Sequence, residues 1–136
     1  MAWRENAAFG NVSINKLWDI SMSVGTEGTN TVTTAITITN AVSGGSPGRA
    51  MAFPFYISSD SAGQVLEAGS DLAITAGTDG LVILSGGDSK VYGHFVTETT
   101  GEMDFIVTDT GTDAYYLNVI MPDGRVETST VMTLTA

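Results

Sequence analysis

The chain has 136 residues, 43% of them hydrophobic, which suffices for one domain around a single apolar core and leaves no room for a second domain of ordinary size. Its formal net charge is −10, from five basic and fifteen acidic residues, and this excludes nucleic-acid binding through phosphate neutralisation. There is no cysteine, so neither a disulfide framework nor thiol chemistry is possible.

The first residues, Met1 to Asn6, lack the basic and apolar regions of a secretory signal. No apolar run approaches the roughly 18 residues that suggest a membrane span. If Met1 is the native start, we expect the protein to be made and kept in the cytosol, without contact with a membrane.

Residues 1–16 show neither helical nor strand periodicity, although they contain large aromatic side chains. Residues 1–18 carry a net charge of +1, and residues 19–136 carry −11. Large aromatic residues and arginine most often anchor protein interfaces. We therefore predict that residues 1–16 form an extended N-terminal arm, with a frayed terminus as the alternative. The predicted interface residues are Trp3, Arg4, Phe9 and Lys16.

From residue 17 onward, short segments rich in Thr, Val and Ile alternate with Gly, Asn, Asp and Pro turn signals, at the spacing of a sandwich or barrel. No segment has the length and periodicity of an ordinary helix. We therefore predict an all-β fold in which residues 17–136 form one β-sandwich domain. The predicted strands are 17–24, 31–42, 51–58, 72–75, 81–84, 90–97, 103–108, 114–121 and 125–134.

Two strand-level expectations follow from local chemistry. Pro54 cannot donate to a hydrogen-bond ladder, so strand 51–58 is expected at a sheet edge or with a bulge. The turn Met121-Pro122-Asp123-Gly124-Arg125 places Gly where a positive φ is needed, which predicts a hairpin between the last two strands.

The segment Asp113-Ala114-Tyr115-Tyr116-Leu117 resembles a shortened form of the Asp-x-Ala-x-Tyr-Tyr-Cys signature of immunoglobulin-like domains, with Leu117 in the place of Cys. The resemblance covers about residues 30–136 and is stronger near the end of the chain. It implies an immunoglobulin-like sandwich in which Tyr115 is buried and its hydroxyl bonds to backbone a few residues upstream. Phe53 and Phe55 stand where antibody domains bury Trp. Bacterial and phage modules of this class lack the disulfide, and they bind or decorate and do not catalyse.

Residues 44–48, Gly-Gly-Ser-Pro-Gly, match the G-x-S-x-G pattern of hydrolases, and Asp60, Asp71 and His94 follow in triad order. A nucleophile elbow requires a strand before Ser46 and a helix after it, whereas here a loop leads into a predicted strand. We therefore predict no catalytic residue.

The sequence also gives little support for a metal site. A single histidine cannot form a zinc site. Asp109 and Asp113, with Asp79 and Asp88 in other loops, are candidates for calcium, but solvated turn residues are the favoured interpretation. No metal or cofactor is predicted.

Three hypotheses remain. The first, which we favour, is a bacteriophage virion structural protein, a capsid decoration or cement protein that contacts the major capsid protein or other virion proteins in a multi-copy or homo-oligomeric assembly. It would be assembled in the host cytoplasm and reside in the virion, and a tail or neck component is the variant of this hypothesis. The second is an adhesive or carbohydrate-binding module of a surface protein. The third is a small esterase.

Overall fold

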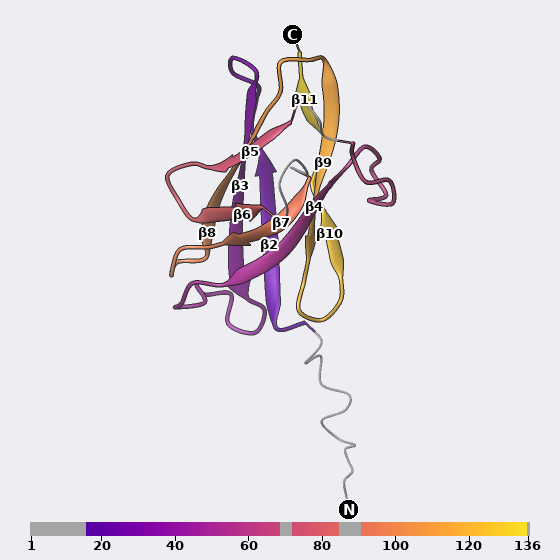
Figure 1. Ribbon diagram of the computed structural model, residues 1–136. Coiled ribbons are helices and arrows are strands. Elements are labelled where there is room, and N and C mark those ends of the chain that lie inside the picture. Colours follow the sequence, from indigo (N-terminus) through magenta and orange to yellow (C-terminus); the bar gives the residue numbers. More distant parts are fainter. Residues whose placement is uncertain (1–15, 69–71, 85–90, 136) are drawn as a thin grey trace, which may run out of the picture.

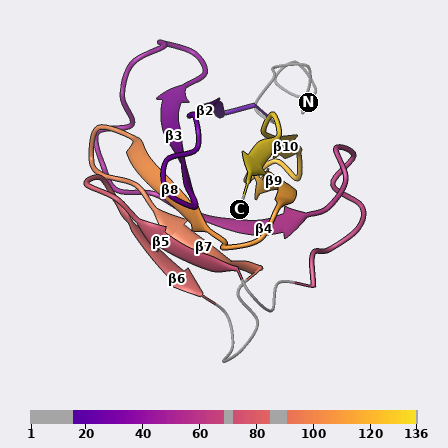
Figure 2. The same ribbon diagram turned by 90° about the horizontal axis from the view of Figure 1, so that it is seen from above.

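The computed structural model describes residues 16–68, 72–84 and 91–135 and shows two antiparallel sheets (Figures 1 and 2). The first sheet has the order β2 (Trp18–Val24), β3 (Thr31–Asn40), β8 (Glu102–Thr108), β5 (Ala73–Ala76). The second has the order β10 (Val126–Thr128), β9 (Asp113–Ile120), β4 (Ala52–Ser58), β7 (Tyr92–Val96), β6 (Leu81–Leu84), and β11 (Met132–Leu134) also pairs with β9. The described residues contain no helix, which confirms the all-β prediction, and the two sheets are consistent with a sandwich. The predicted arm lies almost wholly outside the described residues.

The predicted strands all have counterparts, and two of the differences in extent have a local physical cause. The strand predicted at 31–42 ends at Asn40, because the Asn40 side chain accepts hydrogen bonds from the backbone amides of Val42 and Ser43, at 2.9 and 3.2 Å. Such a side-chain turn competes with continued pairing. The strand predicted at 125–134 is two strands, β10 and β11.

The break between β10 and β11 is a change of register against β9. Thr128 lies opposite Asn118 and Met132 lies opposite Tyr115, so four steps along the C-terminal segment match three along β9. This is a β-bulge, in which one extra residue reverses which alternate side chains face the core. Met132 and Leu134 consequently point inward, and both are fully buried.

The prediction for Pro54 was wrong, because β4 lies between β9 and β7 and pairs with both. The register with β7 is continuous through Pro54, which lies opposite His94, so there is no bulge either. Ile57 donates its amide to Val91, on the β7 side, and by alternation the position of Pro54 faces β9. Pairing with β9 begins only at Phe55. Pro54 has no amide hydrogen to donate, but its position lies just beyond the paired residues of β4 and β9, so no hydrogen bond of that pair is lost.

The core lies between the sheets and is built from the inward side chains of both. Phe55 of β4 meets Phe105 of β8 edge to face, with ring centroids 4.9 Å apart, and Phe95 of β7 lies 5.6 Å from Phe53. Such geometry adds about 0.5–1.5 kcal/mol per pair beyond burial alone. As predicted, Phe53, Phe105, Tyr115, Leu117 and Val119 belong to one core.

The bulge gives the first testable prediction. Insertion of one alanine after Thr130, with the same single bulge, moves Met132 and Leu134 one step along β9 and should turn them outward. This should lower the free energy of unfolding by about 3–6 kcal/mol, since each buried side chain of this size contributes about 1.5–3 kcal/mol. Urea unfolding followed by circular dichroism measures it. Thr130→Ala keeps the chain length and should change stability by less than about 0.5 kcal/mol. Equal stability of the insertion variant and the wild type would contradict the role given to the bulge.

Candidate interaction surface

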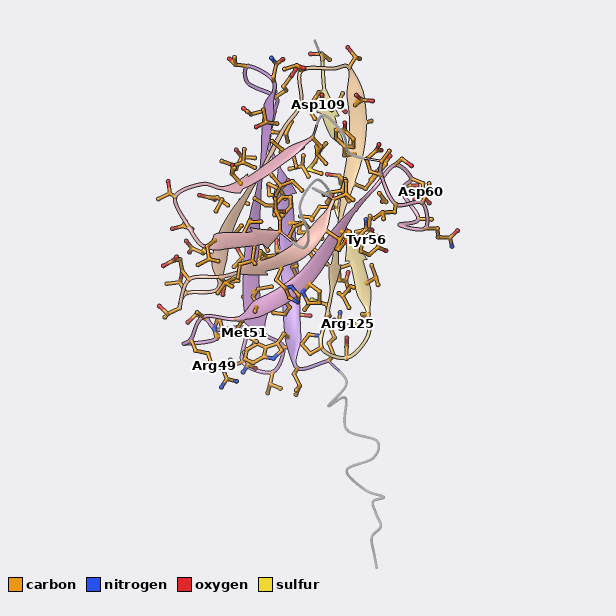
Figure 3. The ribbon with its side chains drawn as sticks, viewed as in Figure 1. Arg49, Met51, Tyr56, Asp60, Asp109 and Arg125 are labelled. Atoms are coloured by element: carbon orange, nitrogen blue, oxygen red, sulfur yellow. The ribbon has the colours of Figure 1, made fainter. Side chains whose placement is uncertain are left out.

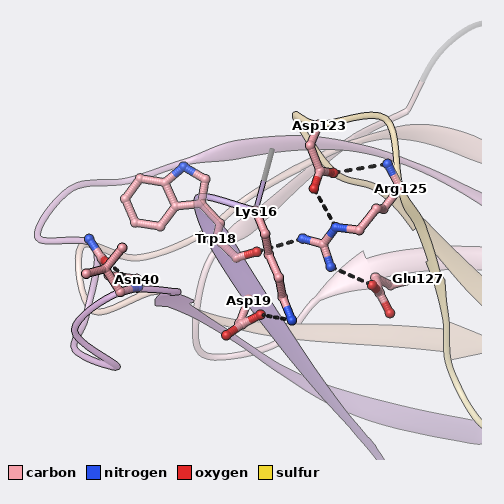
Figure 4. A network of polar contacts seen from close by, with 8 residues as sticks. Lys16, Trp18, Asp19, Asn40, Asp123, Arg125 and Glu127 are labelled. Atoms are coloured by element: carbon pink, nitrogen blue, oxygen red, sulfur yellow. Dashed lines mark hydrogen bonds and ion pairs between the residues drawn. The ribbon is translucent and has the colours of Figure 1, made fainter. Parts of the chain in front are cut away.

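Two basic side chains, Lys16 and Arg125, lie beside Trp18 at the start of β2 (Figure 4), and a third, Arg49, lies over the Trp18 ring. The guanidinium carbon of Arg49 lies 5.9 Å from the centroid of the Trp18 ring. Arg125 donates from Nη2 to the Trp18 carbonyl at 2.8 Å. Lys16 Nζ lies 3.1 Å from the Asp19 carboxylate. We call Lys16, Trp18, Arg49 and Arg125 the basic corner.

The basic corner is assembled from three segments that are distant in sequence. Trp18 begins β2, an edge strand of the first sheet, and its half-buried ring packs against the core. Arg49 comes from the loop between β3 and β4, where Gly48 takes a positive φ of 72°. Arg125 closes the turn between β9 and β10, after Gly124 at a φ of 90°. This turn is the one that the Pro-Asp-Gly pattern predicts.

Arg125 is held on three sides. Its Nε donates to Asp123 at 2.6 Å and its Nη1 to Glu127 at 2.8 Å, while its Nη2 reaches the Trp18 carbonyl. The hydrogen bond from Arg125 to Asp123 raises the pKa of the guanidinium further. Partial burial alone would raise the pKa of Asp123, but the amide and guanidinium of Arg125 outweigh it and hold that pKa below its ordinary value. Arg125 therefore ties the hairpin of the second sheet to the edge of the first.

Arg49 and Lys16 are held much less firmly. Arg49 is exposed. Lys16 and Asp19 have side chains 54% and 44% exposed, and ion pairs of that kind contribute about 0–1 kcal/mol. Their charges are therefore free to engage a partner at little cost to the fold. The corner thus combines a fixed arginine and an anchored aromatic ring with two adaptable cations.

Of the predicted interface residues, the structure places Lys16 at this corner, and Trp3, Arg4 and Phe9 lie outside the described residues. Every Lys and Arg in the described part of the chain belongs to the basic corner. The two other basic residues, Arg4 and Lys90, lie outside the described residues. The sequence analysis did not single out Arg49 or Arg125, because they meet Trp18 only through the fold.

The hydrolase-like residues do not come together. Ser46 precedes β4 and Asp60 follows it, so a strand of seven residues, about 20 Å long, separates them. Figure 3 shows Arg49, from the loop that holds Ser46, at the lower left and Asp60 at the right-hand side, on opposite sides of the molecule. His94 is exposed on the outer face of β7, and Asp71 lies outside the described residues.

The loop carboxylate Asp109 has an internal role. The buried Tyr115 donates its hydroxyl to Asp109 Oδ2, and the Gly111 amide donates to Asp109 Oδ1 at 2.8 Å. The expected bond from Tyr115 to upstream backbone is thus replaced by one to a side chain, because Asp109 is buried beneath the loop and needs a donor. Burial, and then this hydrogen bond, raise the pKa of Tyr115.

The calcium hypothesis gains no support in the described part of the chain. Its His, Asp and Glu residues form no group of three or more that could hold a metal ion. Asp88, one of the four candidates, lies outside that part. The described residues also include no helix long and apolar enough to cross a membrane.

Comparison with protein-family models, with curated proteins and with solved structures finds no match for this chain.

The Tyr115 contact yields the second prediction. Tyr115→Phe leaves the buried Asp109 carboxylate with one donor fewer and should lower the free energy of unfolding by about 1–3 kcal/mol. Tyr116→Phe, on the next residue of the same strand, should change it by less than about 0.5 kcal/mol. Urea unfolding at neutral pH compares the two variants, and equal effects would show that the Tyr115 hydroxyl contributes nothing specific.

The same contact predicts a dependence on alkaline pH. A tyrosine in the unfolded chain loses its proton near pH 10, whereas the raised pKa of Tyr115 keeps it protonated in the folded chain. The stability due to Tyr115 is therefore fully present below about pH 10 and falls as the pH rises above it. The difference in unfolding free energy between wild type and Tyr115→Phe should shrink over that range, and a constant difference would contradict the prediction.

Proposed function

We propose that this chain is a non-enzymatic structural protein of a bacteriophage virion, a capsid decoration protein that stabilises the head through protein contacts. The observation that carries the proposal is the basic corner. It gathers all the described Lys and Arg residues of an acidic chain around one anchored tryptophan, at the point where residues 1–15 join the domain. Aromatic and arginine side chains at one place are characteristic of interface anchors.

An immunoglobulin-like fold is part of the proposal, and the strand order supports it. The neighbours β2-β3-β8-β5 and β10-β9-β4 follow the A-B-E-D and G-F-C orders of that class. Tyr115 and the fully buried Leu117 lie on β9, the strand in the F position. One connection departs from the class. After β4 the chain first forms β5 in the other sheet and only then the β6–β7 pair, where variable-type domains form those two strands before D.

In the proposed complex, the basic corner and residues 1–15 together contact the major capsid protein. Trp3 and Phe9 occupy grooves on the capsid subunit, and each contributes on the order of 2 kcal/mol through burial. Arg49 and Lys16 face acidic groups of the capsid. Because the rest of the chain is strongly acidic, these cations also orient the protein as it approaches.

The third prediction tests this contact by co-sedimentation with heads assembled without the protein. The full chain should bind saturably, and deletion of residues 1–12 should weaken binding at least tenfold, because it removes both predicted aromatic anchors. Arg49→Gln should weaken binding several-fold. Thr33→Asp is the matched control, because it gives the same net charge on an exposed position of β3 and should bind like wild type.

Undiminished binding by both the deletion and Arg49→Gln would overturn the corner as the docking surface. Binding to tail or neck assemblies in place of heads would reassign the protein within the virion. Binding to immobilised glycans, with none to virion components, would favour the adhesive module. Circular dichroism and urea unfolding must first show that each variant folds.

A further inference from the structure

The outer faces of the two sheets differ in chemistry. Side chains that point outward from the first sheet are mainly Thr, Ser and Ala, with three acidic residues, Asp19, Glu102 and Asp104. The outward positions of β6, β7, β4, β9 and β10 that the structure describes include no Asp, Glu, Lys or Arg within the paired stretch. An acidic chain therefore leaves one broad face without charged side chains.

A row of such side chains crosses the second sheet from edge to edge. Ile83 lies opposite His94, His94 opposite Pro54, and Ile120 opposite Val126. Pro54 and Ile120 are adjacent at the next step of the register beyond Phe55 and Val119. We call the surface along this row, with Leu81 and Tyr92 beside it, the uncharged face.

Several large apolar side chains of the uncharged face are exposed to solvent. Leu81, Ile83, Tyr92 and Val126 are 47, 55, 41 and 47% exposed, which makes them four of the nine large exposed hydrophobic residues in the described chain. None of the nine lies on a strand of the first sheet. Apolar surface that gathers on one face, while the opposite face is polar, marks an interaction site.

Two polar side chains of this face, Tyr56 and Asn118, are already satisfied within the chain. The Tyr56 hydroxyl donates to the Gly63 carbonyl at 2.6 Å. The buried Asn118 amide donates to Ser58 at 2.8 Å and accepts from Thr128 at 2.7 Å. Recognition of a sugar or another polar ligand requires polar groups directed at it. The uncharged face offers chiefly apolar contacts, which suit another protein surface.

We propose that the uncharged face binds the same face of a second copy of this chain. Two chains of charge −10 repel each other over most of their surfaces, and contact through the first sheet would bring Asp19, Glu102 and Asp104 against their counterparts. Contact through the uncharged face brings no described strand carboxylate into the interface, so it carries no cost of burying an unpaired charge. A face that packs on itself forms a closed, two-fold dimer.

The size of the face sets the strength of the contact. Five strands about 4.8 Å apart and three outward residues about 6.7 Å apart along each give a face of about 500 Å². Stable specific interfaces bury about 800 Å² on each partner, so this contact belongs to the weak class. Weak lateral contacts suit a protein whose copies are also held by a shared particle, because the particle supplies a high effective concentration.

The fourth prediction is measured by sedimentation equilibrium of the full chain. The average mass should rise toward that of a dimer between about 10 μM and about 1 mM, the range expected for a weak interface. Ile83→Lys and Val126→Lys, at opposite edges of the face, should each raise the dissociation constant at least tenfold. Thr33→Lys adds the same charge to the outer face of the first sheet and should leave the constant within about twofold.

Salt gives an independent readout. Raising the ionic strength from about 0.02 M to about 0.5 M screens the repulsion between the two acidic chains and should tighten the dimer. A contact held by ion pairs would weaken instead. A chain that stays monomeric to about 1 mM at high salt, or Lys variants that dimerise like wild type, would overturn the proposal. So would glycan binding that Ile83→Lys abolishes in a monomeric wild type.

This inference goes beyond the proposed docking through the basic corner, and the two can fail separately. Deletion of residues 1–12 and Arg49→Gln should leave the dimer unchanged, because neither alters a residue of the uncharged face. Ile83→Lys should still bind heads, with lower avidity. A wild-type chain that dimerises but does not bind heads would count against the proposed function alone. A wild-type chain that binds heads but does not dimerise would count against this inference alone.

Discussion

The structure depends on apolar packing between two sheets that no disulfide cross-links. The chain has no cysteine, so the contact that holds β4 against β8 is the edge-to-face pair of Phe55 and Phe105, continued by the other inward side chains. Because strand side chains alternate, that requirement fixes the register of every strand on the core. The outward residues of each strand are then left for solvent or for partners.

Alternation also explains the C-terminal segment. The turn at Gly124 sets the register of β10 against β9, and in that register the last apolar residues would face outward. One extra residue brings Met132 and Leu134 into the core, where they complete the end of the sandwich above Tyr115. The bulge therefore allows the turn to set the register of β10 while the apolar residues of β11 still face the core.

The two proposed contact surfaces differ in the physics of their contacts. The basic corner is electrostatic and aromatic, and Arg125 fixes it by bonding to the edge of the other sheet. The uncharged face is apolar, and the absence of carboxylates is what makes it useful to a chain of charge −10. One surface would orient the protein on a larger particle, and the other would join its copies side by side. In the proposed decoration role, the first contact would hold the protein on the head and the second would join neighbouring copies.

The sequence by itself determined the all-β class, the inward residues of the main strands and the β9–β10 hairpin, because alternation and turn chemistry are local. It could not place Pro54 in a central strand, since the neighbours of a strand depend on how distant segments pair. Nor could it show that Arg49 and Arg125 meet around Trp18, because these residues come together only when the loop and hairpin close on β2. The uncharged face likewise appeared only with the sheet order. Which outward residues share a surface is a property of pairing between strands, and pairing is decided by the tertiary structure.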